Sequence, residues 1–327
     1  MTDARQWIRY CRVYISRNGQ DEEFLDLSGF NVSFRISQKC YGKPSTAIVL
    51  VTNLSKSTAD KVEVEYNTIQ KDKGLRLVID AGYESNHAIV FDGDLWFKTT
   101  GRTSETDSYI KFIAARGDRA YQYAFTNRTI ARGSSQEQLF QNLAEDMKPY
   151  GITDAPVPKY LLKQTRPRGK VICARTHRAM DDFCKTNNLN WGFGDDSIIT
   201  TMYQPVQYTD EEVVVLNAAT GLVGRPELTP TGIDCRCLMN PRIAFGTLFQ
   251  IDNASLQRGD IDTAVMADYN KNLMVSDYAV APDGLYRAYS VEVIGDTRGT
   301  NWYSDIKAYA VNGGKPRDAS YTQFLAN

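Results

Sequence analysis

Residues 224–252 read GRPELTPTGIDCRCLMNPRIAFGTLFQID, and this stretch decides between a metal-binding site and a structural region of strands and turns. Cys235 and Cys237 stand two positions apart in an alternating segment, so a β-strand would point both thiols to the same face. A structural zinc site pairs cysteines across a knuckle of about two to four residues and adds a second such pair, which is missing here. The prolines and glycines around the two cysteines are typical of turns. We therefore interpret the stretch as scaffold.

The composition indicates a globular chain of more than one domain. With 327 residues, 42% of them hydrophobic and 24% charged, the chain can bury a large core and exceeds the usual size of a single domain. No apolar run approaches the roughly 20 residues of a membrane-spanning helix, and the polar N-terminus has no signal-peptide core. We expect neither membrane insertion of the chain nor export by a signal peptide.

The charge balance and the side-chain composition favour a protein that works through packed surfaces over an enzyme. Lys and Arg number 38 against 39 Asp and Glu, so the whole chain supplies no basic field for non-specific nucleic-acid binding. Six cysteines without a secretion signal are typical of reduced thiols. Only two histidines occur, His87 and His177, which leaves little material for acid–base chemistry or metal ligation. The 19 Tyr, 13 Phe and 4 Trp favour strands and subunit interfaces.

The first part of the chain, residues 1–100, is predicted to be a β-barrel domain. Apolar and polar residues alternate over 32–36, which is the pattern of a half-buried strand. Residues 77–97, LVIDAGYESNHAIVFDGDLWF, read as two strands joined by a polar turn at 84–87.

Residues 101–205 are predicted to form a small middle α/β domain. Gln138 stands three positions after Ser135, as in a capping box, and the apolar residues that follow recur at helical spacing. The predicted elements are a strand pair over 108–133, a helix after Ser135, a helix over 176–187 and a hairpin over 187–203.

Strands dominate again in residues 206–327, which we assign to a second β-barrel domain with a C-terminal tail. The predicted fold class is therefore mainly β with an α+β insert, in which two β-barrels flank or carry the small α/β domain.

Candidate catalytic and metal sites are few. Cys173, His177 and Cys184 would align on one helix if that helix extended back to Cys173, and they are the best metal candidate. The same spacing is also produced by a core-facing stripe, which we favour. Adjacent acids such as Asp181 and Asp182 are typical of solvated caps, and no glycine-rich phosphate loop occurs. We expect no catalytic residue, no metal and no cofactor.

The opening stretch and the end of the chain together resemble the second barrel of bacteriophage baseplate hub proteins. In both, a strand ends in a Leu-x-Asn-Pro turn, a Gly bend leads into a strand ending in Asp, and Gly-Asp-Thr-Arg-Gly precedes a Trp-Tyr-x-Asp strand. The residues that carry the resemblance are Leu238, Asn240 and Pro241, then Gly246 and Asp252, then Gly295 to Gly299, and finally Trp302, Tyr303 and Asp305. Residues 77–97 are similar to the first barrel of the same family.

The resemblance implies a homotrimer in which each chain carries two tail-tube-like barrels, so that the ring displays six barrels. Such a ring would bind the sixfold tail tube protein on one face and a threefold spike or puncturing protein on the other. Other baseplate proteins would be further partners. The genome or a tape-measure protein would pass through the channel without specific binding. The expected location is the virion tail, after assembly in the host cytoplasm.

On this interpretation, Cys235 and Cys237 fill a barrel interior or an interface. The interface residues expected from the recognised turns are Arg225, Pro226, Asn240, Pro241, Arg298, Trp302, Tyr303 and Asp305. Two alternatives stay open at this point: a tail-associated hydrolase of the cell wall, and the hub portion of a type VI secretion spike protein. The second alternative demands a β-helical needle after the second barrel.

Overall fold

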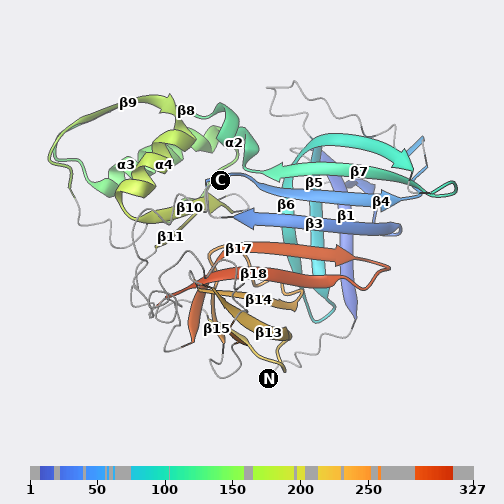
Figure 1. Ribbon diagram of the computed structural model, residues 1–327. Coiled ribbons are helices and arrows are strands. Elements are labelled where there is room, and N and C mark those ends of the chain that lie inside the picture. The colour runs from blue at the N-terminus through green and yellow to red at the C-terminus, as the bar shows by residue number, and fades with distance from the viewer. Residues whose placement is uncertain are drawn as a thin grey trace, which may run out of the picture.

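The computed structural model combines one large curled sheet with a small α/β unit beside it (Figure 1). The structure describes residues 8–17, 23–39, 42–55, 57–58, 62, 75–102, 104–157, 165–194, 197–202, 213–229, 232–251, 257–258 and 284–311. Most of the polar segment 53–74 lies outside these ranges. None of the described helices has the length and apolar character needed to cross a membrane.

The large sheet has 14 strands drawn from both ends of the chain. The N-terminal strands are β1 (Arg9–Arg17), β2 (Glu23–Asp26), β3 (Asn31–Lys39), β4 (Ser45–Thr52), β5 (Leu75–Tyr83), β6 (Asn86–Arg102) and β7 (Ser108–Arg116). The C-terminal strands are β12 (Val214–Leu216), β13 (Leu222–Thr229), β14 (Gly232–Leu238), β15 (Leu248–Ile251), β16 (Gln257–Arg258), β17 (Leu285–Asp296) and β18 (Trp302–Ala310). We call these two sets the N-terminal and C-terminal halves of the sheet.

The two halves meet where β17 pairs antiparallel with β3, from Ser290 opposite Lys39 to Asp296 opposite Ser33. The strand order is β16-β13-β14-β18-β17-β3-β4-β7-β6-β5-β1-β2, with β15 pairing β17 and β12 pairing β15. Within the described residues, β2 and β16 stand at the ends of this path. The 14 strands of the two halves therefore form one continuous sheet.

Alternation along the strands builds a single core for both halves. Buried and less buried side chains alternate strictly along β3 and β4, as the sequence predicted for 32–36. The same cluster of buried residues contains Phe91 and Phe112 from the N-terminal half and Phe249, Tyr286 and Trp302 from the C-terminal half. The curled sheet encloses this cluster, so the halves share one hydrophobic interior.

The insert has its own core. Its elements are α2 (Asp118–Tyr123), β8 (Phe125–Ile130), α3 (Gln136–Met147), the 3₁₀ turn η1 (Lys148–Tyr150), β9 (Lys170–Arg175), α4 (Thr176–Thr186), β10 (Leu189–Phe193) and β11 (Ile198–Met202). Helices α3 and α4 pack through Phe140 and Phe183, whose ring centroids lie 5.7 Å apart. Both predicted helices and the predicted hairpin β10–β11 are confirmed.

The strand pair predicted over 108–133 is wrong in two respects. Residues 118–123 form a short helix, because Gly117 adopts a left-handed φ of 73° and turns the chain sharply out of β7. Strand β7 then pairs with β4 and β6 in the large sheet instead of with β8. Strand β6 likewise runs on to Arg102, past the expected domain limit at residue 100.

The mainly β class with an α/β insert is confirmed, and the capping box at α3 is observed in full. The Gln138 amide donates to Ser135 Oγ at 3.1 Å, and the Ser135 amide donates to Gln138 Oε1 at 3.1 Å. Both bonds satisfy N–H groups that the first turn of a helix leaves without intrahelical partners.

We expect Ser135→Ala to lower the free energy of unfolding by about 1 kcal/mol, because one capping bond is lost. Urea denaturation followed by circular dichroism measures this change. The matched control is Ser134→Ala, which should stay within about 0.5 kcal/mol of the wild type. Equal effects of the two substitutions would contradict the capping role.

Candidate assembly surface

The described residues contain no cluster of three or more His, Cys, Asp or Glu side chains placed to hold a metal ion. The condition under which Cys173, His177 and Cys184 would align on one helix is not met, because α4 begins at Thr176 and Cys173 lies on strand β9. Cys173 is exposed and Cys184 is buried. His177 instead places Nδ1 2.8 Å from the Tyr121 carbonyl oxygen and stacks on the Tyr121 ring.

Asp181 has a structural role that the sequence did not reveal. It is half-buried and accepts a hydrogen bond of 2.7 Å from Trp191 Nε1. Burial raises the pKa of its carboxyl group above the ordinary value. Asp181 is therefore a partner of the buried indole of Trp191 and not the solvated cap expected from its place beside Asp182.

The loop between β17 and β18 binds the N-terminal half of the sheet. The Arg9 guanidinium donates to the carbonyl oxygens of Gly299 at 2.6 Å and Thr300 at 3.0 Å. The Thr297 amide donates to the Val32 carbonyl at 2.9 Å, and the Val32 amide donates back to Thr297 Oγ1 at 3.0 Å. The Gly-Asp-Thr-Arg-Gly segment thus connects the two halves of the sheet.

Asp296 holds this loop in shape. Its Oδ1 accepts hydrogen bonds from the backbone amides of Arg298 at 2.9 Å and Gly299 at 2.7 Å. Gly299 leaves no room for a side chain, because a Cβ there would lie 2.4 Å from an Asp296 carboxylate oxygen. The geometry of the loop therefore requires Asp296 and Gly299.

Trp302 lies at the centre of the contact between the halves. It is 2% exposed, and its Nε1 donates to the Gly82 carbonyl at 3.0 Å. Its ring packs edge-on against Phe34 at 5.8 Å, and the Arg9 guanidinium lies 5.4 Å from the ring centroid. Trp302, proposed from the sequence as an interface residue, contacts the other half of its own chain.

The Asn-Pro turn contributes a second connection between the halves. Asn240 Oδ1 accepts from the Arg242 amide at 3.1 Å, which closes a tight turn around Pro241. The same oxygen accepts from Asn86 Nδ2 at 3.2 Å, at the turn between β5 and β6. The turn predicted from the sequence is confirmed.

The remaining expected interface residues are scattered. Arg225 and Pro226 lie on β13 where its register with β14 shifts, Arg225 exposed and Pro226 buried. Arg298 is exposed on the β17–β18 loop. Tyr303 and Asp305 point to the face of the sheet opposite the core.

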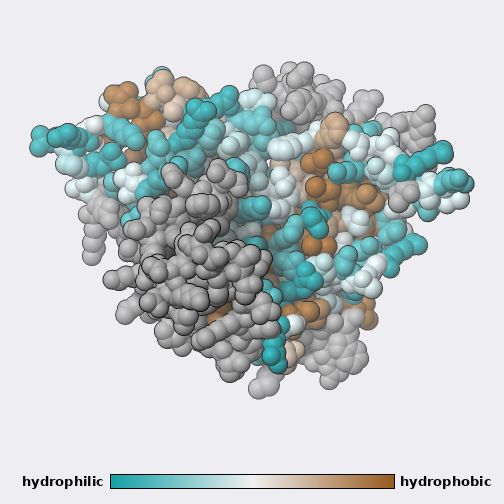
Figure 2. Space-filling view, in the orientation of Figure 1, coloured by the Kyte–Doolittle hydropathy of each residue, from teal (hydrophilic) through white to brown (hydrophobic). Residues whose placement is uncertain are grey.

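That opposite face carries a row of mostly apolar side chains across both halves, which we call the outer row. Register pairs each member with the next across the strands β18, β17, β3, β4, β7 and β6. In that order the members are Tyr303, Ile294, Arg35, Ile48, Ile113 and Phe97. Ile48 is 38% exposed and Phe97 53%. Figure 2 shows the apolar surface over β3, β4 and β7.

Charged side chains flank the outer row. Arg236 donates to both carboxylate oxygens of Asp305, at 2.6 and 3.0 Å, and stacks over the Tyr303 ring at 4.0 Å. Arg35 contacts Glu292 at 3.4 Å. An apolar strip with a charged border is the usual anatomy of a protein–protein contact. This surface, and not a chemical centre, is therefore the candidate functional site.

Sequence reasoning missed Ile48, Ile113 and Phe97. The signal was present in runs such as AIVLV, in which both faces of a strand are apolar. Such runs occur equally in strands covered on both sides, so only the tertiary structure shows that one face is exposed.

The cysteine pair of the opening stretch lies in the core. Cys235 and Cys237 face inward from β14 among the shared buried residues. Burial raises the pKa of the Cys237 thiol to about 12 and also raises the pKa of Cys235. Of the two places expected for this pair, the structure supports the interior.

Comparisons with known proteins agree with this geometry. A family model described as baseplate hub gp41 matches residues 11–256. A comparison with curated proteins found no match.

Solved structures show the same fold at low sequence identity. The tail protein from Neisseria meningitidis MC58 is 7% identical, with a TM-score of 0.55 over 91% of this chain and 96% of that one. The 43 kDa tail protein of prophage MuSo2 from Shewanella oneidensis is 8% identical, with a TM-score of 0.52 over 92% and 97%. An E. coli component of the type VI secretion system is 8% identical, with a TM-score of 0.52 over 92% and 79%.

We expect Trp302→Phe to lower the free energy of unfolding by about 2–3 kcal/mol, because it leaves a void and removes the indole hydrogen bond to the Gly82 carbonyl. Guanidinium denaturation measures the effect. Tyr303→Phe is the matched control on the outward face, and it should change stability by less than about 0.5 kcal/mol. If Trp302→Phe were equally silent, the indole would not hold the halves together.

We expect Cys173, which is exposed, to react much faster with a thiol reagent at neutral pH than the half-buried Cys11 or the buried Cys184. Burial raises the pKa of Cys11 to about 12 and raises that of Cys184, so few reactive thiolates form at those sites. Cys173→Ser should remove one equivalent from the fast phase of colour release with Ellman's reagent. Cys237→Ala should leave that phase unchanged, and a loss of fast thiol in Cys237→Ala would contradict the burial of β14.

Proposed function

Since the chain belongs to the baseplate hub gp41 family, we propose that three copies of it form a ring that joins a sixfold tail tube to a threefold spike. The chain is a structural subunit of a phage tail hub, with its place in the baseplate at the end of the virion tail. Assembly in the host cytoplasm, before the tail is complete, is part of the proposal.

The single observation that carries the ring is the outer row. Phe97 and Ile48 are exposed on the face opposite the core as members of one contiguous row of mostly apolar side chains, and a contiguous apolar surface is typical of a contact with another protein. The row also crosses from the N-terminal to the C-terminal half without a break in strand pairing, at β3 and β17. A second copy of the chain is the partner that would cover such a surface, in a head-to-tail contact that closes after three copies.

The two halves of the sheet would allow a threefold assembly to match a sixfold tail tube. Each half of the sheet contributes one module, so three chains present six modules in a ring. We propose that these modules are the two tail-tube-like barrels, and that residues 118–202 form a separate middle domain on the outside of the ring. The separate buried cluster of the insert supports this division.

Exposed residues at the recognised turns would make the contacts to neighbouring proteins. Arg225, Arg298, Tyr303 and Asp305 reach the surface and are proposed as direct contacts to the tail tube, the spike or other baseplate proteins. The other four would act indirectly. Asn240 and Pro241 hold the Asn-Pro turn, whereas Pro226 and Trp302 are buried residues of β13 and β18. The genome or a tape-measure protein would pass through the ring.

The proposed function is mechanical and not enzymatic. Hub subunits work by adhesion between surfaces, and the family supports this role. The middle domain carries carboxylates such as Asp146 and Asp181, but each accepts hydrogen bonds from its own chain, from Arg128 and Trp191 respectively. Binding, not turnover, is the activity to measure.

We expect Phe97→Asp to reduce the mass of the assembly from three copies to one, because a carboxylate would be buried without a partner in the copy interface. Analytical ultracentrifugation, with and without the spike protein, measures the mass. The matched control is Phe125→Asp on the insert, because Phe125 is 54% exposed against 53% for Phe97. A wild-type chain that keeps single-copy mass even with the spike protein would contradict the ring.

A further inference from the structure

Strands β8 and β9 form a two-stranded ribbon on the side of the insert away from the large sheet (Figure 1). Within the described residues, each strand pairs only with the other. A two-stranded sheet leaves a row of backbone N–H and C=O groups open on both of its edges. Such an edge is a ready template for an added strand.

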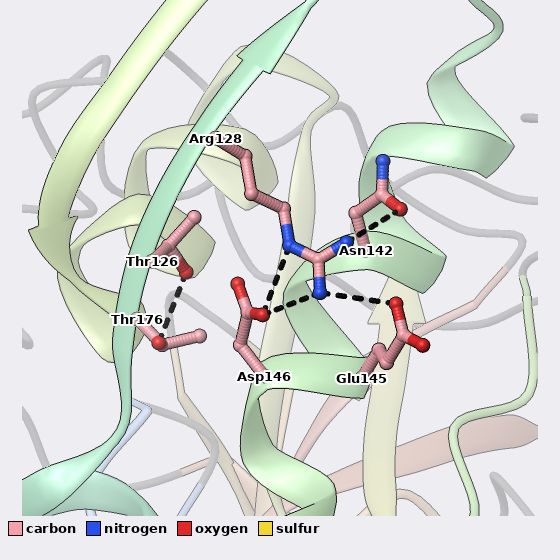
Figure 3. Close-up of polar contacts among 6 residues, drawn as sticks. All are labelled: Thr126, Arg128, Asn142, Glu145, Asp146 and Thr176. Atoms are coloured by element: carbon pink, nitrogen blue, oxygen red, sulfur yellow. Dashed lines mark hydrogen bonds and ion pairs between the residues drawn. The ribbon is translucent and has the colours of Figure 1, made fainter.

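The inner face of the ribbon is firmly attached to the insert (Figure 3). Thr126 and Thr176 join their hydroxyl groups at 3.0 Å in a buried position. Arg128 donates to Asp146 Oδ1 at 2.9 and 2.7 Å and contacts Glu145 at 3.0 Å. These contacts of the inner face fix the conformation of the ribbon, so the outer face is not needed for that purpose.

The outer face of the ribbon carries exposed side chains, and the same residues direct their backbone groups to the ribbon edges. The Thr176 amide donates to the Ala124 carbonyl, which sets the alternation of hydrogen-bonded pairs along the ribbon. By this alternation, the pairs that direct their N–H and C=O groups away from the ribbon are Phe125 with Arg175, Asn127 with Cys173, and Thr129 with Val171. All six of these residues are exposed, Val171 to 72%.

The sequence around β9, from the residues before the strand to the start of α4, is strongly basic in a chain of net charge −1. Residues 165–178 hold five cationic side chains and no carboxylate. Arg166 and Arg168 precede the strand, Lys170 and Arg175 lie on it, and Arg178 lies on α4. Of these, Arg166 donates a hydrogen bond of 3.3 Å to Gln136 Oε1. Between described residues, none of these five forms an ion pair. Arg128, the one cation on β8, is turned inward and paired with Asp146 and Glu145, whereas β9 itself carries Lys170 and Arg175 and follows Arg166 and Arg168. The exposed Arg132 follows β8, so the basic charge is greater around β9 than around β8.

We propose that the β9 edge binds an extended acidic segment of another baseplate protein, in which carboxylate side chains alternate with apolar ones. The backbone of the segment would pair with the outward N–H and C=O groups of Val171, Cys173 and Arg175. Its carboxylates would meet Arg168 and Lys170, and its apolar side chains would cover Val171. A nucleic acid would use the cations but would leave the strand edge unpaired, so the open edge favours a polypeptide.

This surface is separate from the outer row, so the inference does not depend on the proposed ring. The Phe97→Asp variant should bind the acidic segment as the wild type does. Loss of the trimer and loss of this binding are therefore distinguishable.

The probe is a short fluorescent peptide in which Glu alternates with Val, and fluorescence anisotropy measures its binding to the full chain. We expect Arg168→Glu to weaken binding by roughly fivefold to tenfold, because a favourable charge pair becomes repulsive. Val171→Pro should weaken it by at least about fivefold, because an outward N–H donor is lost while the bonds within the ribbon remain. Bound peptide should also slow alkylation of Cys173.

Thr129→Pro is the matched control, because Thr129 lies directly opposite Val171 and offers the same outward N–H on the β8 edge. It should leave binding unchanged, and circular dichroism should show both proline variants folded. Equal loss in the two proline variants would overturn the choice of edge. Equal binding of a single-stranded oligonucleotide, insensitive to Val171→Pro, would overturn the polypeptide partner. Absence of peptide binding near millimolar concentration would overturn the inference as a whole.

Discussion

The antiparallel pairing of β17 with β3 is the interaction on which the rest of the structure depends. It joins strands that lie more than 250 positions apart in the chain, from Ser290 opposite Lys39 to Asp296 opposite Ser33. Closing so long a loop costs conformational entropy, which the shared core and the polar contacts of the β17–β18 loop offset. Arg9, Thr297 and Trp302 supply those contacts, each between the two halves.

The two faces of the continuous sheet have different roles: the inner face forms the core, and the outer face carries the outer row. The inner face of both halves buries the aromatic core, so the outward residues of β3, β4, β17 and β18 are available for contact. The outer row exists because these strands share a register across the junction at β3 and β17. A hub that works by adhesion needs such a surface to be rigid, and a hydrogen-bonded sheet over a single core meets that need.

The insert is held in one orientation by close contacts with the sheet. The Gly42 amide donates to the Trp191 carbonyl at 2.9 Å, and a Cβ at Gly42 would lie 2.7 Å from the Trp191 ring. Gly117 likewise lets the ring of Phe193 approach the backbone. Because β10 faces the sheet in this way, the ribbon of β8 and β9 lies on the side of the insert away from the large sheet (Figure 1).

The sequence by itself determined the elements that depend on neighbouring residues. The capping box at Ser135, the apolar alternation over 32–36 and the Asn240-Pro241 turn were all predictable, because local hydrogen bonds and side-chain periodicity decide them. The resemblance at the end of the chain added the family. Only the tertiary structure decided that Trp302 donates to the Gly82 carbonyl and that Cys173 lies on a strand outside α4. It also decided that Ile48 and Phe97 face outward. These features depend on which distant strands meet and on which face the core forms, and local pattern carries no information on either.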